Sequence, residues 1–264
     1  MIQRTTAAAA LDRAGRRAFP GFKLTSLATT TSTQDVVRAA ARGGAAPGFC
    51  CMADAQTAGR GRQSRSWIAP PGSALLFSVL VRVGHSHLGG VSIAAGLAVR
   101  AAIAASSGGL GRLKWPNDIL AGDRKLAGIL CEVEPAAPGD GTAVVIGAGV
   151  NLTVPSFPSA VAGISLHELV DSPPSPSRLL AAVLPELAAR LEVLDNAGMA
   201  QLRSEWMEHA AGLGAVVTAT SAAGSVTGVP EGIDGEGALL IRADTGVVRV
   251  LAGDVHLTPR ASSG

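Results

Sequence analysis

The spacing of apolar residues changes near residue 213, and this change constrains the fold of the 264-residue chain more than any other feature. Before it, leucines recur at positions 179, 180, 184, 187, 191 and 194, which predicts an amphipathic helix over 178–194. After it, short segments with period-two alternation are separated by Gly/Asp turns such as 233–237. We therefore expect a larger N-terminal unit and a small C-terminal β-barrel over 213–264.

The region 21–212 mixes strand-length and helix-length patterns, so we expect an α+β fold in which helices flank a mixed β-sheet. The sequence predicts strands over 22–28, 48–57, 73–83 and 141–150, and further helices over 91–106 and 197–209. Residues 1–20 are rich in Ala and Arg without a clear apolar face, which predicts a flexible tail.

Composition excludes several classes of protein. Hydrophobic residues make up 47% and charged residues 16%, so the chain is not generally disordered. A net charge of +2 is too small for a whole-protein nucleic-acid binder, and we expect no DNA partner. The three cysteines have no CxxC spacing, which fits a reducing cytoplasm. The apolar runs 74–81 and 91–105 are too short or interrupted to span a bilayer, so no membrane association is expected.

An arginine-rich loop is predicted over 59–67, between two strands. Arg60, Arg62 and Arg65 fall within six residues and would repel one another without an anion among them. The interleaved glycines allow the backbone to approach that anion closely. The segment is therefore interpreted as a phosphate-binding loop, and a solvated basic loop is the simpler alternative.

A second polar segment, 113–132, contains two of the chain's three lysines, Lys114 and Lys125. Pro116 and the Asn117-Asp118 pair predict a hairpin turn that carries an amide and a carboxylate between the two lysines. An ordinary turn with a solvent-facing lysine is the alternative. The scarcity of lysine elsewhere favours a functional role.

Two shorter segments are weaker candidates. Ser32 and Thr33 precede a helical pattern, so they either cap that helix or, with Gln34, bind a polar ligand. The glycines before Asn151 suggest close approach by a ligand, but no third glycine opens a helix there. No GxxxxGK[ST] is present, so any ATP site lacks a Walker loop. A metal site at the two histidines 85 and 87 lacks a third ligand nearby.

These segments together resemble the biotin protein ligases, also called biotin–[acetyl-CoA-carboxylase] ligases. The matches are Ser-Thr-Gln at 32–34, GRGRxxRxW at 59–67, KWPND at 114–118, KLAGIL with its glutamate at 125–132, and GxGVN at 147–151. They occur in the family's order over roughly 22–257. The pairing of KWPND with KLAGIL is the most specific of them.

The resemblance implies a catalytic domain similar to class II aminoacyl-tRNA synthetases over 21–212, followed by the small barrel. It implies an ATP-dependent ligase that forms biotinyl-5'-AMP and transfers biotin to a lysine of the biotin carboxyl carrier domain of an acyl-CoA carboxylase. ATP and biotin would be its substrates, with Mg²⁺ required. A cytoplasmic protein, monomeric or weakly dimeric and without a DNA-binding domain, is expected.

The resemblance also assigns roles to residues. Lys125 and Arg62 would be catalytic, Lys125 touching both the biotin carboxylate and the α-phosphate. The biotin site would comprise Ser32, Thr33, Gln34, Gln56, Arg60, Gly61, Arg62, Lys125 and Gly128. The ATP site would comprise Arg62, Arg65, Trp67, Lys114, Asn117, Asp118, Lys125 and Asn151. No metal cluster is evident, and Mg²⁺ is expected near Asp118.

Two residues depart from the family pattern. Gln34 replaces the usual Asn and is one methylene longer, and Thr258 stands where some members carry an arginine. Two other functions remain open at this point. One is lipoate or octanoate attachment on the same scaffold, whose enzymes lack the paired GRGRxxRxW and KWPND motifs. The other is a non-catalytic protein that binds biotin or its adenylate, against which Lys125 and the full arginine set argue.

Overall fold

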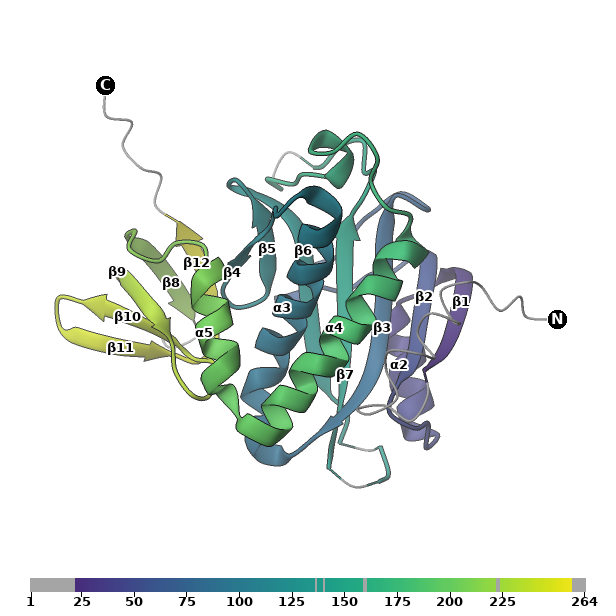
Figure 1. Ribbon diagram of the computed structural model, residues 1–264, viewed down its shortest axis with the longest axis horizontal. Coiled ribbons are helices and arrows are strands. Elements are labelled where there is room, and N and C mark those ends of the chain that lie inside the picture. The colour runs from purple at the N-terminus through teal and green to yellow at the C-terminus, as the bar shows by residue number, and fades with distance from the viewer. Residues whose placement is uncertain (1–21, 136, 140, 159–160, 222–223, 258–264) are drawn as a thin grey trace.

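The computed structural model describes residues 22–257, except 136, 140, 159–160 and 222–223. The predicted tail 1–20 and Thr258 lie outside the described residues. Two β-sheets and four helices make up the described chain (Figure 1). The larger sheet and the first turn of the helix over residues 33–42 position the cavity described below.

Seven strands form the larger sheet in the order β1-β2-β3-β7-β6-β5-β4. Only β1 and β2 are parallel, so the predicted mixed sheet is present. The strands are β1 (Lys23–Thr30), β2 (Phe49–Gln56), β3 (Ala74–Val83), β4 (Arg112–Lys114), β5 (Asp118–Ala121), β6 (Arg124–Val133) and β7 (Thr142–Asn151).

Helices cover both faces of this sheet (Figure 1). On one face, the long helices α3 (Leu88–Ser107) and α4 (Pro176–Ala197) pack on the odd-numbered side chains of β3, such as Phe77 and Val79. On the other face, α2 (Thr33–Arg42) packs against Leu80. The helix α5 (Met199–His209) follows α4 and leads to the smaller sheet. β3 is apolar on both faces because both are covered.

Helix α3 is long and apolar enough to cross a membrane by composition alone, but it is a core helix. Most of its apolar stretch is buried inside the protein, against α4 and the sheet. Its Ala- and Gly-rich sequence allows this close packing, which agrees with the buried helix predicted over 91–106.

Helix α2 carries the hydroxyl segment at its first turn. Ser32 is the N-cap, and its side chain accepts a hydrogen bond from the Gln34 backbone N–H at 3.3 Å. The predicted capping role is therefore confirmed for Ser32. The far end of the helix is fixed by Arg38 and Arg42, whose guanidiniums both donate to Glu134 at 2.9 Å. Hydrogen bonds from Arg42 and Arg38 lower the pKa of this carboxyl to about 2. These ion pairs hold the C-terminal half of α2 against the residue that follows β6.

The C-terminal residues form an open five-stranded sheet, not the closed barrel that the alternating pattern predicted. Its order is β11-β10-β9-β8-β12, and no pairing among the described residues joins β11 to β12. The long strand β9 pairs with β8 through its first half and with β10 through its second. The strands are β8 (Val217–Ser221), β9 (Gly224–Ile233), β10 (Leu239–Ala243), β11 (Gly246–Val250) and β12 (Asp254–Leu257).

The smaller sheet lies beside α5 at the end of the molecule opposite β1 (Figure 1). The indole of Trp115 donates a hydrogen bond to the Gly237 carbonyl at 3.0 Å, which ties the β4–β5 turn to this sheet. A Cβ on Gly89 would lie 2.1 Å from the Glu236 carbonyl oxygen, so α3 and the smaller sheet approach as closely as glycine allows. The other edge of the smaller sheet meets the arginine loop separately, through the ion pair between Arg65 and Asp254 at the start of β12.

Candidate active site

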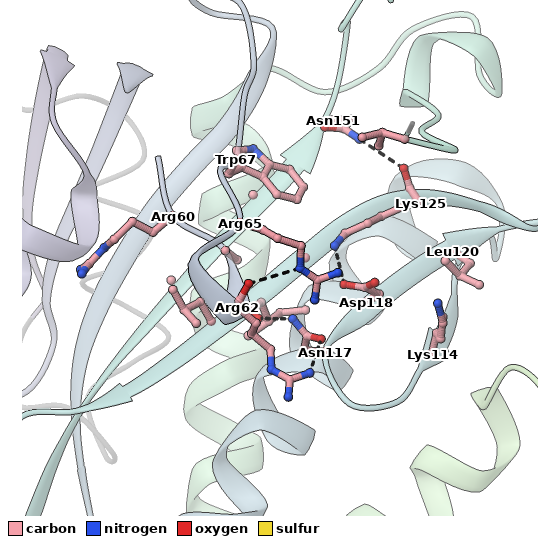
Figure 2. Close-up of a pocket in the computed structure, with 18 of the residues that line it drawn as sticks. Arg60, Arg62, Arg65, Trp67, Lys114, Asn117, Asp118, Leu120, Lys125 and Asn151 are labelled. Carbon is pink, nitrogen blue, oxygen red and sulfur yellow. Dashed lines mark hydrogen bonds and ion pairs between the residues drawn. The ribbon is translucent and has the colours of Figure 1, made fainter. Parts of the chain in front are cut away.

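One cavity of about 1100 Å³ gathers every residue that the sequence assigned to a site. It lies on the same face of the larger sheet as α2, over the part of that face that α2 does not cover, and under the loop 59–67 (Figure 2). Its lining includes Ser32, Thr33, Gln34, Gln56, Arg60, Gly61, Arg62, Arg65, Trp67, Lys114, Asn117, Asp118, Lys125, Gly128 and Asn151. Segments as far apart in sequence as Ser32 and Asn151 therefore meet in one place, and His256 lines the same cavity.

The arginine loop is a compact hairpin-like turn held by its own backbone. The Gly61 amide donates to the Arg65 carbonyl at 2.7 Å, and the Trp67 amide donates to the Gly59 carbonyl at 3.0 Å. A side chain on Gly59 would lie 2.4 Å from the Trp67 carbonyl oxygen, so this position needs glycine. The loop thereby presents Arg62 and Arg65 on one side of the turn.

The three guanidiniums of this loop do not point at a single place (Figure 2). Arg60 reaches back to α2 and β6, where it pairs with Asp35 at 2.8 Å and Glu132 at 3.2 Å. Arg62 and Arg65 instead reach toward Asn117 and the start of β12. The sequence predicted one anion among all three arginines, but the Arg60 side chain is paired with carboxylates of the protein itself.

Arg62 and Arg65 reach the smaller sheet. Arg65 pairs with Asp254 at 2.9 Å, and Arg62 donates to the Gly253 carbonyl at 3.1 Å and to the Asn117 side-chain oxygen at 3.3 Å. Asn117 is itself fixed by donating to a backbone carbonyl of β6 at 2.8 Å. The turn after β4 and the start of β12 therefore set the directions of both arginines.

Lys125 is the cation on the sheet side of the cavity. Its ammonium lies 2.6 Å from the Asp118 carboxylate and 5.5 Å from the centroid of the Trp67 ring (Figure 2). The Lys125 backbone pairs with the segment near Gly163, and its carbonyl accepts from Asn151 at 3.3 Å. Lys125 thus shares the cavity with the arginine loop, with its main chain held on both sides.

Trp67 lies flat against two facing glycines. Gly128 and Gly149 are register partners on β6 and β7. A Cβ on Gly149 would lie 2.3 Å from the indole ring, and one on Gly128 would lie 2.9 Å from it. The glycines of the KLAGIL and GxGVN segments therefore form the hollow that receives this side chain.

Lys114 faces the cavity at the end nearest the smaller sheet. It is half-buried, and no ion pair joins it to any other described residue. Arg112, Leu213 and His256 line the same end. The basic side chains of Lys114 and Arg112 therefore line the cavity near the place where the two sheets meet.

Comparison with known proteins identifies the family. The family model described as "Biotin/lipoate A/B protein ligase family" matches residues 27–151, and that described as "Biotin protein ligase C terminal domain" matches residues 212–257. The biotin–[acetyl-CoA-carboxylase] ligase of Mycobacterium tuberculosis is 37% identical over 248 residues, which are 89% of each protein. The chain belongs to the biotin protein ligase family.

Other family members extend this comparison. The biotin–[acetyl-CoA-carboxylase] ligase of Paracoccus denitrificans is 35% identical over 77% of this chain and 88% of its own length. The bifunctional ligase/repressor BirA of Escherichia coli is 32% identical, and the match covers 80% of this chain but 66% of that protein. The fold matches the biotin protein ligase of Aquifex aeolicus in complex with biotin and ATP, with a TM-score of 0.78 at 24% identity, over 89% of this chain and 98% of that one.

Two further residues of this ligase belong to the site but escaped the sequence analysis. Ser78 lines the cavity from β3 and is 1% exposed, and its signal was a single hydroxyl inside the apolar run 74–81. Asp254 contacts Arg65 and lies 3.9 Å from Arg62. No local pattern distinguishes Asp254 from the other acidic residues near strand ends, so only the packing of the two sheets reveals it.

The described part of the cavity offers few ligands for a divalent cation. Among the residues that the structure describes, no group of three or more His, Cys, Asp or Glu side chains could hold one. One oxygen of Asp118 is buried in the cavity without a hydrogen bond and faces only the Lys125 ammonium. A single carboxylate beside bound phosphates is how Mg²⁺ is commonly held, so Asp118 fits an ion that arrives with a nucleotide.

Proposed function

We propose that this ligase activates biotin with ATP and transfers it to a lysine of a biotin carboxyl carrier domain of an acyl-CoA carboxylase. The supporting observation is that Lys125, Arg62 and Arg65 share one cavity with a buried polar wall. A carboxylate and a triphosphate repel each other, so their reaction needs fixed cations at the point where they meet.

In the first step, an oxygen of the biotin carboxylate attacks the α-phosphorus of ATP, and the bond to pyrophosphate breaks. The products are biotinyl-5'-adenylate and pyrophosphate. Negative charge grows on the phosphate oxygens as the new bond forms, and the Lys125 ammonium stabilises it from the sheet side. Asp118 keeps that ammonium in place, since the two groups lie 2.6 Å apart.

Arg62 and Arg65 would bind phosphate oxygens, and Lys114 would support charge on the departing pyrophosphate. When bound, Mg²⁺ beside Asp118 would neutralise further phosphate charge. Asn117 and Asn151 keep the surrounding backbone and Arg62 in register through their side-chain hydrogen bonds. The roles of Asn117 and Asn151 thus follow from the hydrogen bonds that their side chains make.

In the second step, the amine of the acceptor lysine attacks the carbonyl carbon of the mixed anhydride. An amide forms, AMP leaves with the bonding electrons, and the amine loses a proton. Because the mixed anhydride hydrolyses readily, the intermediate needs protection from water. Trp67 lies over Gly128 and Gly149 beside Lys125 and would cover the reacting carbonyl.

The buried wall favours biotin over lipoate or octanoate. Thr33, Gln34 and Ser78 are at most 3% exposed, and Gln56 lies at the same wall. A ureido ring offers both donors and acceptors to such a wall. A dithiolane ring or an alkyl chain offers neither and would leave these polar groups unpaired, which disfavours binding.

We also propose that residues 21–212 form the catalytic domain and 213–264 a second domain. This division is supported by the end of α5 at His209 and the start of the smaller sheet at Val217. The likeness of the larger sheet to class II aminoacyl-tRNA synthetases, a cytoplasmic location, and a monomer or weak homodimer without a DNA partner are parts of the same proposal. Light scattering at several protein concentrations tests the oligomeric state.

The reaction is tested by incubating the protein with a carboxylase carrier domain, ATP, Mg²⁺ and, in separate samples, biotin, lipoate or octanoate. Intact-protein mass spectrometry should show one biotinyl addition to the carrier domain and none with the other acids. A carrier domain whose acceptor lysine is replaced by arginine is the control. Transfer of lipoate or octanoate instead of biotin would overturn the substrate assignment, and binding of biotin without any transfer would support the non-catalytic alternative.

A further inference from the structure

The polar wall of the cavity is a connected hydrogen-bond network that reaches into the core. Thr33 and Gln34 come from the first turn of α2, Gln56 from the end of β2 and Ser78 from the middle of β3. The network contains three contacts between oxygen atoms: Ser78 to Gln34 at 2.8 Å, Thr33 to Ser78 at 2.8 Å, and Thr33 to Gln56 at 3.1 Å. Two hydroxyl protons must serve these three contacts.

The orientation of the Gln34 amide is fixed by its surroundings. Its nitrogen lies 3.1 Å from the Val145 carbonyl oxygen and 3.3 Å from that of Leu130. Carbonyl oxygens only accept hydrogen bonds, so the amide nitrogen must face them and the amide oxygen must face Ser78. That oxygen only accepts, and Ser78 therefore donates its single proton to Gln34. Both the nitrogen and the oxygen of the Gln34 side chain are therefore hydrogen-bonded to other residues of the protein.

The direction of the next contact follows from the first. Because the Ser78 proton is directed at Gln34, the Thr33 hydroxyl has one proton for two acceptors, Ser78 at 2.8 Å and the Gln56 amide oxygen at 3.1 Å. The contact with Ser78 is shorter and has no other proton, so the Thr33 proton is assigned to it. The remaining contact, between the Thr33 hydroxyl and the Gln56 amide oxygen, then has no proton. That oxygen already accepts from the Thr33 backbone amide at 2.8 Å, so it does not need one.

We propose that Gln34 and Ser78 are positioning residues that make the Thr33 hydroxyl a pure acceptor toward the cavity. The same reasoning fixes Gln56. Since its oxygen accepts from a backbone amide, its NH₂ group is the available donor, and no described residue accepts from it. An acceptor and a donor at one wall select the adjacent N–H and C=O of a cyclic urea. This inference rests on the proposed function and adds the means of recognition.

The backbone opposite the network is built for the longer Gln34 side chain. A Cβ on Gly147 would lie 2.5 Å from the Gln34 amide oxygen and 3.2 Å from the Ser78 hydroxyl. Gly147 is the register partner of Ser78 across β3 and β7. Glycine at this position therefore leaves the space in which the Gln34 oxygen meets the Ser78 hydroxyl.

The test compares biotin with the two cyclic carbamate analogues in which one or the other ureido N–H is replaced by oxygen. Dissociation constants are measured by calorimetry for the wild type and for Ser78→Ala. In the wild type, one carbamate places an oxygen against the acceptor Thr33, so its affinity should be lower than that of biotin by about tenfold or more. In Ser78→Ala the Thr33 proton is released and can meet that oxygen, so the preference for biotin should shrink by roughly tenfold.

Controls separate this effect from a general loss of structure. Ser73 is a buried serine whose hydroxyl donates to the Pro70 carbonyl outside the network, so Ser73→Ala should leave the preference unchanged. Thr33→Val should remove the preference, and Ser78→Ala added to Thr33→Val should have no further effect on it. If Ser78→Ala does not fold, as judged by thermal unfolding, Thr33→Val alone carries the test.

Equal loss of affinity for biotin and both carbamates in Ser78→Ala would overturn the inference, because a structural defect does not distinguish the ligands. An unchanged preference in Thr33→Val would overturn it as well. If the wild type binds biotin but the variants give either of these results, the proposed function stands and only the assigned direction of the network fails. If the wild type does not bind biotin, the proposed function itself is overturned and this inference with it.

Discussion

Replacing Gly149 by alanine should disable the arginine loop without disturbing the sheet that carries it. The added Cβ would lie 2.3, 2.6 and 2.7 Å from three atoms of the Trp67 ring system. The indole is rigid, and an ordinary carbon–carbon contact needs about 3.5 Å, so the ring must move away by about 1 Å. Gly149 lies in β7 at the centre of the sheet, whereas Trp67 ends a loop, so the loop should move rather than the strand.

The size of the effect follows from that displacement. Trp67 closes the loop that carries Arg62 and Arg65 through its backbone bond to Gly59, so a shift of the ring moves the arginines as well. A misplacement of about 1 Å reduces the rate of a positioned reaction by about 100-fold. Overpacking at one site typically lowers the free energy of unfolding by about 1–3 kcal/mol. Adenylate formation should therefore fall by about 100-fold while the protein stays folded.

The assay is pyrophosphate release in the presence of biotin and ATP, together with tryptophan fluorescence. Trp115 and Trp206 are 4% and 3% exposed and supply a constant background, so a change in emission reports on Trp67. Gly235→Ala is the matched control, since its Cβ would have no neighbour within 4 Å. Replacing Trp67 by the smaller phenylalanine should partly restore the rate of Gly149→Ala. A normal rate with unchanged emission, or no rescue by Trp67→Phe, would refute the reasoning.

Three other variants test separate parts of the site. Lys125→Met should lower pyrophosphate release by at least about 100-fold, with an unchanged melting temperature, because only the ammonium is lost; a rate within a few-fold of wild type would contradict its role. Glu134 has a folded pKa lowered to about 2 by hydrogen bonds from Arg42 and Arg38, so its contribution to stability is complete above pH 4.5 and is lost as the pH falls toward 2. Glu134→Gln should therefore unfold more readily at pH 7, by at least about 1.5 kcal/mol, with a weaker pH dependence below 4.5 in urea titrations. Gln34→Asn should raise the KM for biotin by roughly tenfold and leave that for ATP unchanged, since the shorter amide cannot reach both its carbonyl acceptors and Ser78; equal changes in both constants would count against its position at the biotin end.

Local sequence patterns located most of the helices and strands. The leucine spacing over 178–194 falls within α4, and the apolar run 73–83 contains β3. Both were predictable because the spacing of apolar residues reflects which side of a helix or strand is buried. The motif residues were also found from sequence, since scarce lysines and clustered arginines are unusual in a mostly apolar chain. Their gathering in one cavity was expected from the family resemblance.

Local sequence patterns could not show whether the C-terminal strands close into a barrel or form an open sheet. Alternation predicts that a segment is a strand and which of its faces is buried, but it does not name the strand's partner. The long strand β9 divides its pairing between β8 and β10, and β11 and β12 remain at opposite ends of the sheet. The presence of short strands in this region was therefore predictable, and the open arrangement was not.

The sequence by itself determined which residues could neutralise a carboxylate and a triphosphate, because charge and hydrogen-bonding capacity belong to the side chains. Only the tertiary structure decided what each of them faces. It turned Arg60 toward Asp35, brought Asp254 to Arg65 from 189 residues away, and placed Ser78 between Thr33 and Gln34. Such partners depend on how α2 and the two sheets pack, and no local spacing along the chain records that packing.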